Sequence, residues 1–488
     1  MYLGLDIGTS GVKAILLSDH GEVAAQATAP LPISRPRSLW SEQNPADWWT
    51  ATNSAVDRLP ANLRSKVQAI GLAGQMHGAT LLDEDDQPLR PAILWNDGRS
   101  EAECTTLEAR VPNSREITGN IAMPGFTAPK LVWTANFEPE IFERTEKVLL
   151  PKDYVRFLMT GEFATDLSDA AGTLWLDVAK RDWSDDILRA CHLSRDHMPS
   201  VFEGSQITGE VLASVAEAWK VPTGTPVIAG GGDNAAGAVG MGVFDPGDAF
   251  LSLGTSGVLF AADDAYRPNA ESGVHTFCHA VSDRWHQMSV MLSAASCLDW
   301  ASQFAGINDV GRLISEAEAR GNIGKSETLF LPYLSGERTP HNNPRAKGVL
   351  FGLSHESDVG ELGQAVLEGV ALAFADGLDV LASSSDIASI SVIGGGARSP
   401  YWGRILAAAL NRPLVYRENA EVGPALGAAR LAQMGVNGET QPSLKAPPIV
   451  SEINPIADDV DRMKAKLDRF RSLYTSTKHL LQKDATNV

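Results

Sequence analysis

The chain has 488 residues, of which 44% are hydrophobic, and a formal net charge of −19 at pH 7. This length and apolar content allow two large cores, so we expect two domains. The acidic balance argues against a nucleic-acid surface and against adhesion to anionic lipid, so a phosphate site would have to rest on local backbone dipoles or a metal ion.

Cysteine usage and hydropathy indicate the compartment. The four cysteines are scattered and form no CxxC pair: Cys104, Cys191, Cys278 and Cys297. This favours reduced thiols in the cytosol over a disulfide framework. His275, Cys278 and His279 have ligand-like spacing, but no second cysteine pair completes a site, which favours a buried thiol beside ordinary histidines. Without a leader-like segment or a long apolar run, we expect a soluble cytoplasmic protein with no nucleic-acid or membrane partner.

The first predicted unit is a strand at 1–7, a turn at 8–11 and a returning strand at 12–17. The pentapeptide GTSGV of this turn, at 8–12, recurs identically at 254–258, again between two predicted strands. The two copies lie half the chain apart, which indicates duplicated halves rather than a short-period repeat.

The rest of the first half contains a buried strand at 67–74 that ends at Gln75-Met76-His77. Two short strands, 80–82 and 91–95, flank an acidic tip and are predicted to form a hairpin. A helix follows from residue 101, and 120–190 is interpreted as an insertion around the first core.

The second lobe is predicted to alternate strands and helices, with glycine-rich loops after its strands. The predicted segments are a strand-to-helix passage at 284–300, a helix at 359–381, a strand at 388–393 leading through 394–399 into a helix that ends at 410, a strand at 413–416, a small-residue helix from 423, and an amphipathic helix at 460–481. Because the polar face of the last helix carries acids as well as bases, we expect packing and not membrane anchoring.

Between the halves, the apolar strand 227–229 runs into Gly230-Gly231-Gly232-Asp233-Asn234. We expect the glycines to form a turn from which a carboxylate and an amide project side by side. The alternative is that Asp233 and Asn234 merely cap the following helix.

The two Gly-Thr-Ser-Gly turns each offer backbone N–H groups and two hydroxyls to one concavity, which suits phosphate oxygens. No GxxxxGK[ST] loop occurs and no GxGxxG follows the opening strand, which excludes P-loop and Rossmann sites. Asp6 lies near the end of the first strand, just before the first turn, where a carboxylate beside phosphates needs a cation such as Mg²⁺; alternatively it caps its own turn. Asp233, in a different loop, is suited to accept a hydroxyl proton during phosphoryl transfer to an alcohol.

Motifs along the chain together resemble the FGGY family of carbohydrate kinases: LDIGTSGVKAILL, AGQMHGATLL, ILWNDGR, MPGFTAPKLVW, GGGDNAAGAVG, LSLGTSGV, LPYLSGERTPHNN, KGVLFGL and VIGGGARSPYW. The resemblance is weakest over 190–225 and beyond 430. It implies a duplicated actin-like, ribonuclease-H-like α/β fold with ATP in the cleft between two lobes. We expect a sugar-binding N-terminal lobe at 1–242 and a nucleotide-binding C-terminal lobe at 243–488. A homodimer is a further expectation.

The resemblance also implies site residues. Asp233 would be the general base and Asp6 the Mg²⁺-associated acid, and both acids are candidates for holding the ion. The sugar pocket would contain Met76, His77, Asp233 and Asn234. ATP would contact Gly8, Thr9 and Ser10 of the first phosphate turn, Gly254 and Thr255 of the second, and Gly395, Gly396, Ala397 and Arg398 on the nucleoside side.

The resemblance further implies D-xylulose as the substrate, phosphorylated at its 5-hydroxyl by direct in-line transfer. Glycerol kinases of this family carry an Arg-Glu pair where this chain has Met76-His77, and Gln where it has Asn234. A neutral imidazole and an amide hydrogen-bond sugar hydroxyls, and a methionine gives an adaptable apolar contact. The alternatives are that His77 is a surface histidine, that the substrate is another ketose or polyol such as ribulose or glycerol, or that the protein is an actin-like or chaperone-like ATPase or a non-catalytic sugar sensor. Asp97 and Arg99 are interpreted as a structural frame of the pocket.

Overall fold

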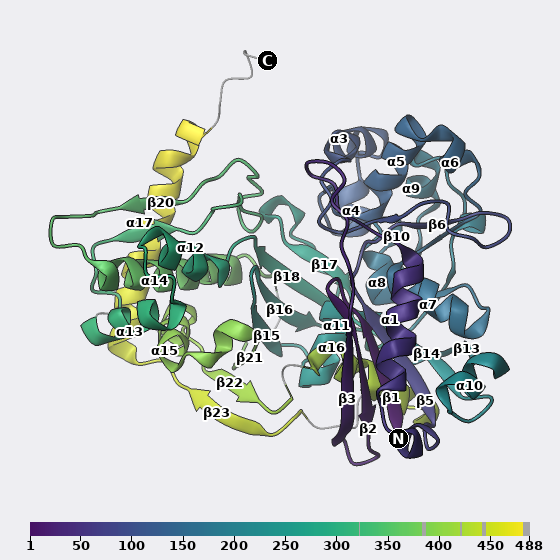
Figure 1. Ribbon diagram of the computed structural model, residues 1–488. Coiled ribbons are helices and arrows are strands. Elements are labelled where there is room, and N and C mark those ends of the chain that lie inside the picture. Colours follow the sequence, from purple (N-terminus) through teal and green to yellow (C-terminus); the bar gives the residue numbers. More distant parts are fainter. Residues whose placement is uncertain (322, 383–386, 420–421, 442–445, 482–488) are drawn as a thin grey trace.

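The computed structural model describes residues 1–321, 323–382, 387–419, 422–441 and 446–481. Two α/β lobes lie side by side, with the first half of the chain in one and most of the second half in the other (Figure 1). The domain boundary at 242/243 stays a prediction.

The first lobe is built, in the described residues, on a six-stranded sheet of order β13-β14-β5-β1-β2-β3. From β1, the sheet continues through antiparallel β2 and β3 on one side, and through parallel β5 and β14 and then antiparallel β13 on the other. The strands are β1 (Tyr2–Ile7), β2 (Gly11–Leu17), β3 (Val23–Pro30), β5 (Ala69–Gly74), β13 (Ile207–Glu210) and β14 (Pro226–Gly232).

The second lobe contains a sheet with the order β17-β18-β16-β15-β21-β22-β23 over the parts of the chain that the structure describes. From β15, antiparallel β16 and β18 follow on one side, and parallel β21 and β22 and then antiparallel β23 on the other. The strands are β15 (Ala249–Leu253), β16 (Gly257–Asp263), β17 (His275–Cys278), β18 (Trp285–Met291), β21 (Ile390–Ile393), β22 (Leu414–Arg417) and β23 (Ile449–Ile453).

The two sheets therefore have the same topology, apart from the added β17, and the duplication predicted from the repeated pentapeptide is confirmed. Both repeats lie at the tip of the corresponding hairpin, β1–β2 and β15–β16. In this correspondence Asp6 stands where the second half has Ser252. The acid before the turn is thus present in the first half alone.

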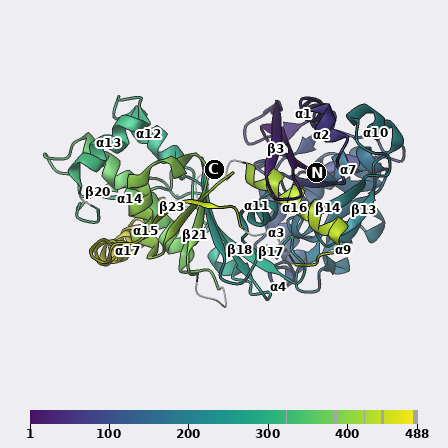
Figure 2. The same cartoon turned by 90° about the horizontal axis from the view of Figure 1, so that it is seen from below.

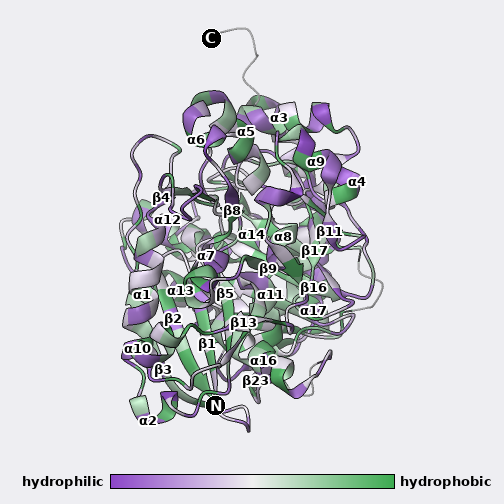
Figure 3. Cartoon of the chain, turned by 90° about the vertical axis from the view of Figure 1, so that its right-hand side faces the viewer, coloured by the Kyte–Doolittle hydropathy of each residue, from purple (hydrophilic) through white to green (hydrophobic). Residues whose placement is uncertain are grey.

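Helices cover the sheets, and the strands β1, β2 and β5 are strongly hydrophobic while the peripheral helices carry hydrophilic residues (Figure 3). Those of the first half are α1 (Pro45–Asp57), α2 (Ala61–Arg64), α3 (Glu101–Arg110), α4 (Ser114–Thr118), α5 (Thr127–Phe137), α6 (Pro139–Glu143), α7 (Pro151–Thr160), α8 (Leu167–Ala171), α9 (Asp185–Ala190), α10 (Ala213–Trp219) and α11 (Asp233–Met241). Those of the second half are α12 (Ser296–Phe304), α13 (Val310–Arg320), α14 (Val359–Leu378), α15 (Pro400–Leu410), α16 (Gly423–Asn437) and α17 (Ala457–Thr477).

Helices α11 and α16 lie between the two sheets in both views (Figures 1 and 2). They pack backbone to backbone, since a Cβ on Gly240 of α11 would lie 2.2 Å from the carbonyl oxygen of Gly423 in α16. Helix α16 also packs on β1 and β5 of the first sheet. Helix α16, from the second half of the chain, therefore packs against the first lobe and forms part of its core.

The predicted hairpin at 80–95 is wrong in its strand pairing. β6 (Thr80–Leu82) pairs with β8 (Lys147–Leu149), and β7 (Ala92–Ile93) pairs with β4 (Glu42–Gln43), although an isolated bridge joins Ala79 to Ile93. Such short strands take whichever partner the tertiary fold brings alongside, which their sequence does not specify. Further short strands are β9 (Ala164–Asp166), β10 (Leu176–Asp177), β11 (Asp182–Trp183), β12 (Ser200–Phe202), β19 (Leu329–Leu331) and β20 (Val349–Phe351).

The predicted turn at 230–232 is also wrong, because β14 continues through the three glycines and α11 begins directly at Asp233. The pairing of β14 with β5 shifts register between Ile228 and Gly231, which is a β-bulge. Gly230, inside the bulge, has φ +82°, and a Cβ there would lie 1.8 Å from the carbonyl oxygen of Leu72. Only glycine fits this position.

The amphipathic helix predicted at 460–481 is confirmed as α17, extended by a short 3₁₀ turn at Lys478–Leu481. Met463 and Phe470 of α17 are fully buried in the core of the second lobe. Among the described helices, none is long and apolar enough to cross a membrane.

Candidate active site

The candidate residues of the first lobe lie at the carboxyl ends of three neighbouring parallel strands. In the register of β1, β5 and β14, Ile7 pairs with Gly74, and Gly74 pairs with Gly232. The residues that follow these three strands are the first phosphate turn after β1, the corner Gln75-Met76-His77 after β5, and Asp233 after β14. The carboxyl edge of a parallel sheet is where α/β folds bind ligands. The structure therefore brings the predicted acids, the predicted sugar corner and one phosphate turn to one place.

Burial raises the pKa values of both candidate acids, Asp6 and Asp233. Burial, together with the negative charge of Asp233, raises the pKa of Asp6 to about 7, against the opposing effect of Lys13. Burial raises the pKa of Asp233 to about 6, although hydrogen bonds from Asn234 oppose the shift. Within the described residues, Oδ1 of Asp6 is buried without a hydrogen-bond partner. A carboxylate oxygen without a partner, facing a second acid, fits a divalent cation, because oxygen donors and negative charge are what Mg²⁺ prefers.

His77 is held from three sides at the corner after β5. Its φ is +70°, and its Nδ1 lies 2.5 Å from the carbonyl oxygen of Gly172, just beyond α8. Its own carbonyl accepts from Nζ of Lys130 at 2.7 Å and from Oγ1 of Thr127 at 3.2 Å.

The imidazole of His77 is neutral. Burial and the charge of Lys130 lower its pKa to about 3. Because a carbonyl can only accept, Nδ1 carries the proton toward Gly172 and Nε2 is left as an acceptor. An imidazole in this state is suited to receive a hydrogen bond from a sugar hydroxyl.

Met76 and Asn234 contact the segment where β14 ends and α11 begins with Asp233. A Cβ on Gly232 would lie 3.0 Å from Sδ of Met76, so the methionine packs on the residue before the acid. Asn234 donates from its backbone N (2.7 Å) and from its side-chain Nδ2 (2.9 Å) to Oδ1 of Asp233. Asn234 therefore orients the acid itself, a contact that the sequence prediction of a sugar ligand did not include.

The first phosphate turn is tied to the sugar corner through Thr9. Its hydroxyl donates to Oε1 of Gln75 at 3.0 Å and accepts from Nε1 of Trp95 at 3.0 Å. Gln43 links them further: its Nε2 donates to the carbonyl of Thr9 at 2.7 Å, and its Oε1 accepts from Nε2 of Gln75 at 2.8 Å. Trp95 remains 45% exposed at this edge of the site.

In the second lobe, a cavity of about 410 Å³ lies beside the loop after β21. Gly395, Gly396 and Arg398, three of the residues predicted on the nucleoside side, line it. Leu298, Val310, Ile314 and Trp402 supply apolar walls, which suits a planar base. The predicted second phosphate turn follows β15, where the carbonyl of Thr255 accepts from the backbone N of Ala294 at 2.9 Å.

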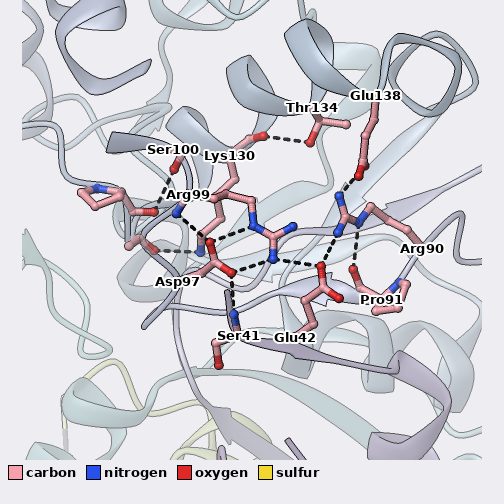
Figure 4. Close-up of polar contacts among 12 residues, drawn as sticks. Ser41, Glu42, Arg90, Pro91, Asp97, Arg99, Ser100, Lys130, Thr134 and Glu138 are labelled. Atoms are coloured by element: carbon pink, nitrogen blue, oxygen red, sulfur yellow. Dashed lines mark hydrogen bonds and ion pairs between the residues drawn. The ribbon is translucent and has the colours of Figure 1, made fainter. Parts of the chain in front are cut away.

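Asp97 and Arg99 pair with each other inside the first lobe (Figure 4). Arg99 donates to both oxygens of Asp97, at 2.9 and 2.7 Å, and reaches Oε1 of Glu42 at 2.8 Å. Asp97 also accepts the backbone N of Ser41 at 2.6 Å. Figure 4 shows Arg90 continuing this chain of ion pairs from Glu42 to Glu138. The network agrees with the structural role interpreted from the sequence.

The histidine and cysteine group at 275–279 makes other contacts than metal ligation. His275 donates from Nδ1 to Oδ1 of Asn120 at 2.8 Å and accepts at Nε2 from Arg338 at 3.0 Å. His279 contacts the carbonyl of Val243 at 3.1 Å. Within the described ranges, no three histidine, cysteine, aspartate or glutamate side chains form a group that could hold a metal ion. The four cysteines are free and buried, and burial raises the pKa of Cys278 to about 12.

Sequence reasoning assigned no role to four residues that contact the candidate residues or their neighbours in the structure: Gln75, Trp95, Lys130 and Ser168. A lysine inside the apolar segment TAPKLVW and a tryptophan at the end of a predicted strand were visible signals for Lys130 and Trp95. For Ser168 the sequence held no signal, because serine in a small-residue segment is unremarkable.

Comparison with known proteins gives the class. Residues 1–240 match the N-terminal domain of the FGGY family of carbohydrate kinases, and residues 249–436 match its C-terminal domain. The chain belongs to this family, and its two lobes have the duplicated actin-like ATPase fold.

Individual relatives are similar over nearly their whole length. The chain is 58% identical over 478 residues to a xylulose kinase of Escherichia coli (strain K12), covering 97% of this chain and 98% of that one. It is 55% identical over 486 residues to a xylulose kinase of Klebsiella pneumoniae, covering 99% and 100%. Among solved structures, a xyloylose kinase from Brucella ovis has a TM-score of 0.93 at 47% identity, covering 98% and 99%.

Proposed function

We propose that this chain catalyses ATP-dependent phosphorylation of D-xylulose to D-xylulose 5-phosphate, with ADP as the second product. The observation that carries the chemistry is the convergence of Asp6, His77 and Asp233 at the ends of β1, β5 and β14. The full-length similarity to xylulose kinases supports the choice of sugar.

In the proposed reaction, the carboxylate of Asp233 accepts the proton of the 5-hydroxyl. Since Oδ1 already accepts two hydrogen bonds from Asn234, we assign the proton to Oδ2. The bond from the sugar oxygen to the γ-phosphorus forms as the bond from that phosphorus to the bridging oxygen of ADP breaks, in one in-line step without a phosphoenzyme. His77 accepts a sugar hydroxyl at Nε2, and Met76 packs on the carbon chain.

The remaining candidates bind ATP in this proposal. Gly8, Thr9 and Ser10 contact phosphate oxygens from the first lobe, and Gly254 and Thr255 do so from the second. The cavity lined by Gly395, Gly396 and Arg398 takes the nucleoside, and Ala397 belongs to the same turn of the chain. Asp6, with Asp233 near it, would hold Mg²⁺, which would neutralise charge that develops on the phosphates.

A panel of purified substrates tests the proposal, with release of ADP as the readout. We expect a kcat/KM for D-xylulose at least about tenfold above those for ribulose, glycerol and gluconate, because correctly placed hydroxyls discriminate strongly. Equal values would point to a kinase for another polyol. ADP release that no sugar stimulates would instead indicate an ATPase of the actin-like or chaperone-like class.

The role of Asp233 is tested separately with Asp233→Asn, which keeps size and removes the basic oxygen. We expect kcat to fall by about 10² to 10⁴, the usual contribution of a positioned base, with the KM for ATP changed little. A variant that folds and retains near wild-type kcat would show that this base is assigned wrongly.

A further inference from the structure

The end of β14 directly before Asp233 is irregular and rich in glycine. Three successive glycines precede the acid, and glycine restricts the backbone least of all residues. The bulge at Gly230 also interrupts the regular ladder between β14 and β5. A general base must nevertheless be held within a fraction of an ångström of its working position. Some contact from outside the strand must therefore fix this segment.

Ser168, at the start of α8, makes such a contact. Its hydroxyl oxygen accepts the backbone N–H of Gly232, the residue directly before Asp233, at 3.0 Å. The same hydroxyl donates to Oδ2 of Asp166. Both side chains are fully buried. The hydroxyl is therefore fixed in direction, with its proton toward Asp166 and a lone pair toward Gly232.

A fully buried group of charges holds Asp166 in turn. Nζ of Lys152 lies 2.8 Å from Oδ1 of Asp166, 2.6 Å from Oδ1 of Asp153 and 3.0 Å from Oδ2 of Asp169. Burial raises the pKa of the Asp169 carboxyl well above its ordinary value. Nη2 of Arg156 lies 3.4 Å from Oδ1 of Asp153, so a second buried cation joins the group.

Arg156 of α7 donates hydrogen bonds directly to the bulged segment of β14. Its Nη1 donates to the carbonyl of Ile228 at 2.8 Å, and its Nη2 donates to the carbonyl of Ala229. These are the carbonyls next to the register shift. A buried guanidinium can satisfy both because its donors form a rigid fork. The charge group thus contacts β14 at the bulge through Arg156 and after it through Ser168.

We propose that Ser168 is a positioning residue for Asp233, acting through the N–H of Gly232 and backed by Asp166. Its removal leaves the sugar corner attached, because His77 bonds to the main-chain carbonyl of Gly172 and not to Ser168. The proposal rests on Asp233 being the base. It predicts an effect on kcat far larger than on either KM.

The experiment is a double-mutant cycle of Ser168→Ala and Asp233→Asn, with kcat and both KM values measured for each protein. We expect Ser168→Ala alone to lower kcat by about 10- to 100-fold, as small displacements of catalytic groups do, with each KM within about threefold of wild type. In the Asp233→Asn background, where no general base remains to be positioned, Ser168→Ala should change kcat by less than about twofold.

Two results would overturn the inference. The first is an equal fold-loss of kcat from Ser168→Ala in the wild-type and Asp233→Asn backgrounds, which would indicate a general structural defect. The second is no loss of kcat from Ser168→Ala alone. Near wild-type kcat in Asp233→Asn alone would instead reject the base itself, and this inference with it. Thr52→Val is the matched control, because the Thr52 hydroxyl is equally buried but donates to the carbonyl of Trp48 inside α1.

A second measurement does not depend on activity. Hydrogen–deuterium exchange of the peptide spanning residues 230–234 should quicken in Ser168→Ala, and should not change in Thr52→Val. Ser168→Cys, which keeps the volume but supplies only a weak acceptor, should give an intermediate rate. Unchanged exchange in both Ser168 variants would contradict the proposed contact.

Discussion

Nδ1 of His77 lies 2.5 Å from the carbonyl oxygen of Gly172, so a hydrogen bond links the corner after β5 to the C-terminal end of α8. The contact fixes the tautomer of the imidazole and leaves Nε2 as its acceptor. Because the pKa of His77 is lowered to about 3, by burial first, the ring stays neutral at and around pH 7.

For His77→Ala we expect a KM for D-xylulose raised by about 10- to 100-fold, since a sugar hydroxyl loses its acceptor, and an unchanged KM for ATP. In the wild type, the KM for the sugar should show no inflection near pH 6.5 from this ring. His192→Ala is the control, because His192 also has a positive φ, of 60°, but is exposed. A raised KM for ATP in His77→Ala would contradict the assignment.

The cavity beside the loop after β21 predicts a substitution that acts on the nucleotide alone. Ile314→Trp on α13 places an indole into the space of about 410 Å³. We expect the KM for ATP to rise at least about tenfold, while the KM for the sugar stays within about twofold. Glu316→Trp, two residues away on the same helix and outside the lining, should leave both constants unchanged. Equal kinetics of the two variants would show that the nucleoside binds elsewhere.

The backbone contact between α11 and α16 predicts opposite effects for two glycines of one helix. Gly240→Ala should destabilise the protein by about 2–3 kcal/mol or more, because its Cβ would meet the carbonyl of Gly423 at 2.2 Å. Gly237→Ala, whose Cβ would meet nothing closer than Pro424 Cγ at 3.8 Å, should be neutral or stabilising by up to about 1 kcal/mol. Urea unfolding measures both. Similar stabilities would contradict the tight packing of this helix pair.

His286 predicts a dependence of stability on pH. Burial lowers the pKa of His286 well below 6.5, and the ring stacks on Phe260 at 4.3 Å. Below about pH 6.5 the unfolded chain binds a proton that the folded chain does not, so the folded state loses stability as the pH falls.

For His286→Phe, which keeps the stacking and removes the titrating group, we expect a gain in Tm relative to wild type that is larger at pH 5.5 than at pH 7.5. The difference should correspond to about 1 kcal/mol. Exposed His355 supplies the control substitution, His355→Asn, which should behave alike at both pH values. A gain that does not depend on pH would show that His286 is not responsible for acid sensitivity.

The sequence by itself determined the duplication, the family and most of the strands and helices of the two sheets. These depend on local patterns: an apolar run that ends in Gly-Thr-Ser-Gly forms a hairpin in each half, and the acid before the turn is in the first half alone. Asp6, His77 and Asp233 were found in this way because each directly follows or ends such a run.

Only the tertiary structure decided which segments meet. It paired Thr80–Leu82 with Lys147–Leu149, turned the glycines before Asp233 into a bulged strand end, and brought Ser168 to Gly232 across 64 positions of sequence. The physical reason is that the local sequence does not specify the partner of a short strand, a single serine or a buried charge. That partner depends on which segments the packing of the core brings next to it. The candidate residues His77 and Asp233 follow strand ends. Lys130 of α5, which donates to the carbonyl of His77, and Ser168 of α8, which accepts from Gly232, come from helices that are distant in the sequence.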